Sequence, residues 1–191
     1  YIGHSAVRNG RHITHDGVNT IVFGSDNVND IKNENKVKIF FEKVGINYLI
    51  PKDIIHSLWL KYMLNVSANQ TTAIFRMTFG EMFENEKCME FAINIMKEVQ
   101  AIAKVQGVNN SETLIDEALE SLKTMTPDGK TSMLQDVEAG RKTEVDMFAG
   151  TIIKMGLEHN IPTPYNKIIK EMLEIIYRQQ EISRSKLLAN C

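Results

Sequence analysis

The sequence predicts a mainly α-helical protein, a helical bundle preceded by a short β-containing segment. From residue 51 onward, apolar residues recur with a period near 3.6, which is typical of amphipathic helices. Short β-prone runs occur only in the first 50 residues. The chain has 191 residues, of which 43% are hydrophobic, so it is long enough to bury a core of its own. We therefore expect a mixed part over residues 1–50 and an all-α domain over residues 51–191.

The opening part is expected to hold a hairpin, a helix and a strand. Its two β-prone runs lie on either side of Asp16-Gly17, a pair that favours a tight hairpin turn. Gly24 to Asn27 then ends the second strand and offers helix caps, and Gly45 ends the helix that follows. The predicted elements are strands around Ile13 and over Val18 to Phe23, a helix from Val28 to Val44, and a strand from Ile46 to Ile50.

The remaining chain is expected to form a series of helices. The first begins near Pro51 or Asp53, because proline and aspartate are both favoured in a first turn. Its apolar stripe runs from Ile54 to Val66. The later helices are predicted over Asn85 to Gln106, Ser111 to Met125, Ser132 or Met133 to Gly156 or beyond, and Tyr165 to Leu188.

Composition excludes several classes of protein. Lys and Arg number 22 against 24 Asp and Glu, so the net charge of -2 makes nucleic acid an unexpected partner. No apolar run is long enough to span a bilayer and no export signal opens the chain, so we expect a cytoplasmic protein without a membrane anchor. The chain begins at Tyr1 rather than at a methionine, which suggests a cut or processed piece.

No metal site is expected. Two cysteines, Cys88 and Cys191, provide neither a disulfide framework nor the ligands of a structural zinc. His4, His12 and His15 lie on or near the predicted hairpin without a carboxylate or cysteine at ligand spacing, so we interpret them as surface or edge-strand residues.

A polar stripe on the helix after Pro51 is the first candidate site. Lys61, Asn65 and Asn69 are spaced i, i+4 and i+8, which places their side chains within about 80° of one another on an α-helix. Asparagine is unfavourable inside a helix, so two at this spacing call for partners. A lysine beside two carboxamides can bind a carboxylate or protonate a carbonyl oxygen. The alternative is an ordinary amphipathic helix with a solvated lysine and asparagines that bond to neighbouring helices.

A second candidate site begins at Ser132, after a Pro127-Asp128-Gly129 turn. Ser132 could cap a helix and direct its hydroxyl and nearby N–H groups at an anion. Glu144 follows twelve residues later and lies near Ser132 only if the helix breaks around Gly140. The alternative is that Ser132 is a simple cap and Glu144 a surface carboxylate.

The two candidate sites together resemble the signatures of the ketopantoate reductase (2-dehydropantoate 2-reductase) family. The stretch from Leu58 to Asn69, LWLKYMLNVSAN, resembles the family segment W-x-K-x-x-x-N-x-x-x-N. The segment from Ser132 to Asp146, followed by Ile161-Pro162-Thr163-Pro164, resembles the second family signature, in the same order. This resemblance implies the helical C-terminal domain of the family, of the 6-phosphogluconate dehydrogenase C-terminal-like type. It also implies that residues 1–50 are the end of a Rossmann-type nucleotide-binding domain.

The resemblance implies an enzyme that uses NADPH to reduce 2-dehydropantoate, a 2-oxo acid, to pantoate in pantothenate and coenzyme A biosynthesis. By this resemblance, Lys61 is the general acid that protonates the ketone oxygen. Asn65 and Asn69 orient the substrate or the lysine, and Ser132 binds the substrate. Glu144 organises the lysine, the substrate and the nicotinamide end of the cofactor.

The chain lacks a G-x-G-x-x-G motif, so the site for the cofactor phosphates is expected outside it. We therefore expect these residues alone to bind NADPH weakly and not to turn over. Cut sheet edges would favour a homodimer through the N-terminal strands. Two alternatives stay open at this stage: a related 2-oxo acid reductase, and a non-enzymatic helical dimerisation or ligand-binding module on the same fold.

Overall fold

The computed structural model describes the backbone of residues 1–189 and the side chains of residues 1, 10–14, 19–27 and 29–187. The chain divides into two compact units, unit 1 (Tyr1–Leu58) and unit 2 (Trp59–Cys191). Helix α2 (Ile54–Leu64) crosses the boundary between them. Most of the described residues are helical and the strands are confined to unit 1, which confirms the predicted fold class.

Unit 1 is a small sheet with one helix. Strand β1 (Ile2–Asn9) pairs antiparallel with β2 (His12–Val22), which pairs in parallel with the short β3 (Tyr48–Leu49). A 3₁₀ turn, η1 (Val28–Asp30), leads into α1 (Ile31–Val44), which ends at Gly45 in the left-handed conformation. The ring of Phe41 on α1 lies 5.3 Å from Phe23 and 6.0 Å from Tyr48, centroid to centroid, and these contacts hold the helix to the strands.

The hairpin forms, but its turn is not at Asp16-Gly17. The strands run from Ile2↔Ile21 to Asn9↔His12, so the turn lies at Gly10-Arg11 and Asp16-Gly17 falls inside β2. Gly10 has a φ of 61°, the positive value that a tight turn needs and that glycine accepts without strain. Asn9-Gly10 is itself a hairpin signal, so the sequence held two candidate turns and the prediction chose the wrong one.

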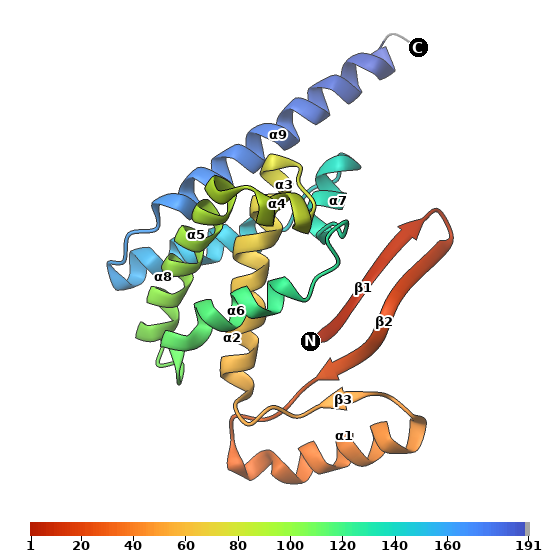
Figure 1. Cartoon of the computed structure of the whole chain (residues 1–191), viewed down its shortest axis with the longest axis vertical. Helices are drawn as coiled ribbons and strands as arrows, with labels where there is room; N and C mark the ends of the chain where they lie inside the picture. The colour runs from red at the N-terminus through yellow and green to blue at the C-terminus, as the bar shows by residue number, and fades with distance from the viewer. Residues whose placement is uncertain (190–191) are drawn as a thin grey trace. The chain divides into compact units, whose positions relative to one another are not determined.

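Unit 2 is a helical bundle built around α5 (Glu86–Val105). One face of α5 buries Ala92, Ile95, Met96, Val99 and Ile102, each 0% exposed. This helix packs against most of the other elements of the unit, and it lies among the other helices of the bundle in Figure 1. None of the helices within residues 1–189 combines the length and the apolar character needed to cross a bilayer. The elements of the unit after α2 are η2 (Asn65–Asn69), α3 (Gln70–Phe75), α4 (Phe79–Glu84), α5, η3 (Ser111–Thr113), α6 (Leu114–Lys123), α7 (Ser132–Glu138), η4 (Asp146–Gly150), α8 (Thr151–His159) and α9 (Pro164–Ala189).

Two predicted helices are interrupted. The helix expected from Ser132 to Gly156 stops after Glu138, because Gly140 has a φ of 63° that a continuing α-helix cannot contain. It resumes at η4 as a π-helical turn and continues as α8. The helix after Pro51 changes to π geometry over Asn65–Asn69 and ends at Arg76, which is left-handed with a φ of 55°.

Candidate active site

The polar stripe runs from Lys61 on α2 into the π-helical segment η2, which carries Asn65 and Asn69. Asn69 and Asn65 are half-buried and share one face, as the i, i+4 spacing predicts. They also bond to each other, because Asn69 Nδ2 donates to Asn65 Oδ1 at 3.3 Å. Three buried side chains on the same stretch donate to carbonyls four residues earlier. The pairs are Ser67 with Met63 (2.7 Å), Gln70 with Val66 (2.6 Å) and Thr72 with Ala68 (2.9 Å). These donors supplement the backbone bonding where the α pattern widens to π, a feature common at functional sites.

Lys61 lies one turn before this segment and is half-buried. Within the described part of the chain, its ammonium takes part in none of the ion pairs. Burial lowers the pKa of Lys61 below the usual 10.5, because the charged form loses solvation. A partly buried cation that lacks a carboxylate partner is well suited to meet a negative charge on a ligand.

Hydrogen bonds of Tyr62 and Gln70 attach η4, at the end of the second family segment, to the helical stretch that carries the first. The hydroxyl of Tyr62 donates to the carbonyls of Met147 (3.1 Å) and Phe148 (2.9 Å), and burial raises the pKa of Tyr62 to about 12. The Gln70 Oε1 atom accepts from the Ala149 N–H at 3.3 Å. Gln70 therefore connects η2 and η4 directly. These bonds fix η4, which begins two residues after Glu144, against the helix that carries Lys61.

The start of α7 is attached to α3 by a pair of buried threonines. The hydroxyls of Thr72 and Thr131 lie 2.7 Å apart, and Thr131 Oγ1 also accepts from the Leu134 N–H. Thr131 is therefore the cap of α7, and the expectation that Ser132 could cap it is wrong. Both residue types cap helices well, and only the one with extended backbone takes the role. Ser132 is the first helical residue and its side chain is exposed.

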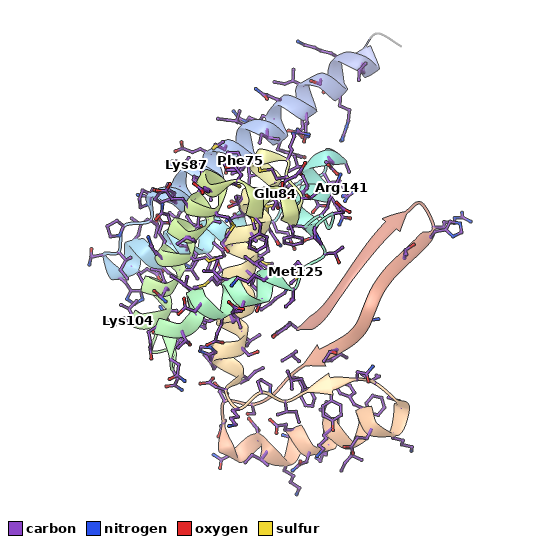
Figure 2. All side chains as sticks on the ribbon, viewed as in Figure 1. Phe75, Glu84, Lys87, Lys104, Met125 and Arg141 are labelled. Atoms are coloured by element: carbon purple, nitrogen blue, oxygen red, sulfur yellow. The ribbon has the colours of Figure 1, made fainter. Side chains whose placement is uncertain are left out.

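Glu144 lies in the loop that joins α7 to η4. Its side chain is exposed, and its carbonyl accepts from the N–H groups of Met147 and Phe148. Arg141, labelled near α7 in Figure 2, pairs with Asp136 at 2.7 Å and stabilises the turn after that helix. The break at Gly140 removes Glu144 from the α-helical register with Ser132 that an unbroken helix would impose.

The structure thus brings together the elements that carry the five predicted site residues. Asn65 and Asn69 are in direct contact, and the segments next to Lys61, Ser132 and Glu144 are connected by partly or fully buried hydrogen bonds. Convergence of all five side chains on one substrate stays a prediction. Sequence reasoning missed the residues that make these ties, Tyr62, Gln70 and Thr131. A signal existed for Tyr62, because a tyrosine on a buried stripe needs a partner for its hydroxyl.

A family model described as "Ketopantoate reductase PanE/ApbA C terminal" matches residues 53–176, more than half of the chain. Among curated proteins, the 2-dehydropantoate 2-reductase of Pyrococcus horikoshii is 28% identical over 134 residues, which cover 70% of this chain and 44% of that protein. The chain spans about half the length of the curated relatives it matches.

Solved structures share the fold. A ketopantoate reductase of the PanE/ApbA family from Ralstonia eutropha has a TM-score of 0.78 at 23% identity and covers 95% of this chain and 59% of its own. D-mandelate dehydrogenase in a ternary complex with NADH and anilino(oxo)acetate has a TM-score of 0.84 at 18% identity, and covers 94% and 60%. At these identities the likeness concerns the fold alone. From the family match, the chain belongs to the ketopantoate reductase family and corresponds to its C-terminal region.

Proposed function

We propose that this chain is the substrate-binding and catalytic C-terminal part of an NADPH-dependent reductase that converts 2-dehydropantoate to pantoate. The observation that carries the proposal is Lys61: a half-buried ammonium with a lowered pKa, one turn before the Asn65–Asn69 amide pair. The curated relatives that the chain resembles are 2-dehydropantoate 2-reductases, and the two segments that carry the candidate residues both lie inside the matched region.

Lys61 is the proposed general acid. Reduction of a ketone places negative charge on its oxygen, and an ammonium at that oxygen both stabilises the charge and supplies the proton. Burial lowers the pKa of Lys61, so this lysine gives up its proton more readily than a solvated lysine. Burial therefore favours proton transfer to the substrate oxygen.

The remaining candidates are proposed to orient the reactants. The Asn65–Asn69 bond uses one amide N–H and one amide oxygen, so each side chain retains hydrogen-bonding capacity for the substrate. The exposed hydroxyl of Ser132 is proposed to bind the carboxylate or hydroxyl of the substrate. The exposed carboxylate of Glu144 is proposed to contact Lys61 or the nicotinamide ribose.

The donor set fits the nicotinamide end of a dinucleotide. The amides of Asn65 and Asn69, the hydroxyl of Ser132 and the carboxylate of Glu144 can all form hydrogen bonds with a ribose or a carboxamide. Among them, Glu144 is proposed to bind the nicotinamide end of the cofactor. A glycine-rich phosphate loop is not present in this sequence. When bound, NADPH supplies the hydride, and the residues of this chain bind the substrate, orient it and transfer the proton.

The fold does not decide the substrate. D-mandelate dehydrogenase shares this fold. A related 2-oxo acid reductase could therefore have the same fold and different side chains in its substrate pocket. A non-enzymatic module on the same fold is the other alternative. A homodimer through the N-terminal strands stays a prediction.

The test is a reductase assay on the longest open reading frame that contains this chain. We expect NADPH oxidation with 2-dehydropantoate, and a much lower kcat/KM with other 2-oxo acids such as benzoylformate. Comparable turnover of another 2-oxo acid would assign the related reductase instead. No turnover by a folded protein that binds neither NADPH nor a 2-oxo acid in calorimetry would favour the non-enzymatic module. The 191-residue chain alone is expected to bind NADPH weakly.

A further inference from the structure

Gln70 is a buried glutamine whose side chain bonds to two different helical turns. It is 0% exposed. Its Nε2 atom donates to the Val66 carbonyl at 2.6 Å, and its Oε1 atom accepts from the Ala149 N–H at 3.3 Å. Val66 belongs to η2 and Ala149 to η4, and Gln70 and Ala149 are 79 positions apart in the sequence. One amide therefore joins two segments that are distant along the chain.

The bond to Ala149 replaces a helical bond that the π geometry of η4 removes. In an α-helix, the N–H of Ala149 would donate to the carbonyl of Val145, four residues earlier. In η4, that carbonyl accepts from the N–H of Gly150 at 3.1 Å, five residues later. Ala149 is 0% exposed, so bulk water does not reach its N–H. Gln70 Oε1 supplies the acceptor that this buried donor needs.

The bond to Val66 has the same relation to η2. In an α-helix, the carbonyl of Val66 would accept from the backbone N–H of Gln70. Here that N–H donates to the carbonyl of Ser67, and the side chain of Gln70 donates to the carbonyl of Val66. Each end of the amide therefore bonds to a backbone group whose α-helical partner has been moved by a π turn.

The two π turns carry candidate site residues. Asn65 and Asn69 are the first and last residues of η2. On the other side, the carbonyl of Glu144 accepts from two N–H groups of η4, so the backbone of Glu144 is part of the first turn of that segment. Gln70 therefore connects the backbone that carries the amide pair to the backbone that carries Glu144.

We propose that Gln70 is a positioning residue of the reductase. It holds the π turns of η2 and η4 together, and so it fixes the placement of Asn65 and Asn69 relative to Glu144. This role rests on the proposed function, in which those side chains orient the reactants. Because Gln70 is 0% exposed and both ends of its amide are bonded within the protein, it acts through these residues and does not contact the substrate.

Substrate binding through Ser132 depends on a different bond. The start of α7, which carries Ser132, is attached to α3 by the hydroxyls of Thr72 and Thr131. Loss of the Gln70 amide leaves that bond in place. We therefore expect Gln70 to affect the reaction step more than the binding of the substrate.

The test compares Gln70→Met with Ser67→Ala in the full-length reductase. Methionine is unbranched like glutamine and has no amide, so it removes both bonds with little loss of packing. Ser67 is also 0% exposed, and its hydroxyl donates to the carbonyl of Met63, four residues earlier on the same helical stretch. Ser67→Ala therefore removes a buried bond without releasing η4. Circular dichroism and thermal unfolding establish that both variants are folded at the assay temperature.

Kinetics with 2-dehydropantoate measure the positioning role. Gln70→Met should lower kcat by about 10- to 100-fold, because a displacement of about 1 Å at the reacting groups has an effect of this order. KM should change by less than about threefold, and Ser67→Ala should keep kcat within about twofold of the parent. A glutamine that only stabilised the fold would lower the Tm, as Ser67→Ala does, and leave the kcat of the folded enzyme unchanged.

Hydrogen exchange followed by mass spectrometry measures the contact without relying on activity. A peptide that covers residues 145–150 should exchange at least about tenfold faster in Gln70→Met and at the parental rate in Ser67→Ala. If the parent reduces no 2-oxo acid, the proposed function fails, and the exchange rates alone then decide whether Gln70 holds η4.

Three results would overturn the proposal. They are a parental kcat in folded Gln70→Met, unchanged exchange of residues 145–150 in that variant, and an equal loss of kcat in Ser67→Ala. If Gln70→Met does not fold, Gln70→Asn is measured in the same way, because its shorter amide cannot reach both partners.

Discussion

On one side of the candidate site, Lys61, Asn65 and Asn69 are half-buried on one helical stretch. The buried side chains of Ser67 and Gln70 on the same stretch donate hydrogen bonds to its backbone carbonyls. On the other side, Ser132 and Glu144 are exposed, one at the first position of a short helix and one in a loop. The first side has fixed geometry and a perturbed lysine pKa, as a proton donor needs. The second side has side chains free to adapt to a ligand. We infer that the buried side supplies the reaction chemistry and that the exposed side contributes binding.

This difference between the two sides predicts that catalysis depends most strongly on Lys61. In the full-length reductase, Lys61→Ala should lower kcat by about 10²- to 10⁴-fold, the usual contribution of a general acid. Lys104→Ala, at an exposed lysine on α5, is the control and should retain the parental rate. Steady-state kinetics with 2-dehydropantoate measure both variants. Near-normal turnover of Lys61→Ala would show that another group donates the proton.

Within the buried side, stability should depend far more on the fully buried Gln70 than on the half-buried Asn69. Gln70 is 0% exposed and bonds both to the Val66 carbonyl and to the Ala149 N–H. Gln70→Ala would leave that buried N–H unpaired and open a cavity, so we expect a loss of about 2–4 kcal/mol in the free energy of unfolding. Its neighbour Asn69 is half-buried and bonds to Asn65, so Asn69→Ala should cost about 1 kcal/mol or less. Urea unfolding measures both, and equal losses would contradict the distinction between them.

A third pair of variants compares adjacent residues at the start of α7. Thr131 is buried, caps the helix and contacts Thr72, so Thr131→Ala should cost about 1–2 kcal/mol. Ser132 is exposed, so Ser132→Ala should change stability by less than about 0.5 kcal/mol. In the full-length enzyme, Ser132→Ala should instead raise the KM for 2-dehydropantoate. Thermal unfolding and kinetics together separate the two residues. A Ser132→Ala variant as unstable as Thr131→Ala would make Ser132 a structural residue.

Sequence periodicity predicted the buried side better than the exposed side. The apolar stripe from Ile54 to Val66 correctly predicted the helix that carries Lys61, and the spacing of Asn65 and Asn69 predicted that they share one helical face, although not that they bond to each other. Sequence periodicity could not predict the π-helical geometry of η2. It depends on side-chain donors to carbonyls and on the packing of η4, which joins the helix from about 80 residues later in the chain.

On the exposed side, the relative positions of Ser132 and Glu144 depend on where α7 ends. The apolar periodicity of a sequence defines helix ends poorly. The apolar pattern continues across Gly140, so one long helix was predicted, whereas the positive φ of that residue ends α7. A glycine in a helical pattern is compatible with both outcomes. A similar ambiguity put the predicted hairpin turn in the wrong place. Asn9-Gly10 and Asp16-Gly17 are both turn signals, and only the pairing register of the strands decides between them.

The smallest expected effect concerns the cost of keeping Lys61 in its place. Because burial lowers the pKa of Lys61 in the folded protein, the folded state binds fewer protons than the unfolded chain between that pKa and 10.5. The contribution of Lys61 to stability therefore rises with pH across this window, and below it the full penalty for the buried charge applies. Lys61→Met keeps most of the stem and removes the charge, so at neutral pH it should raise the Tm by about 1–3 °C. The difference from the parent should shrink as the pH approaches 10.5. Differential scanning calorimetry at neutral and alkaline pH, with the exposed Lys104→Met as control, measures it. A destabilising Lys61→Met at neutral pH would mean that the ammonium stabilises the fold, and the inference that burial of Lys61 costs stability would then be wrong.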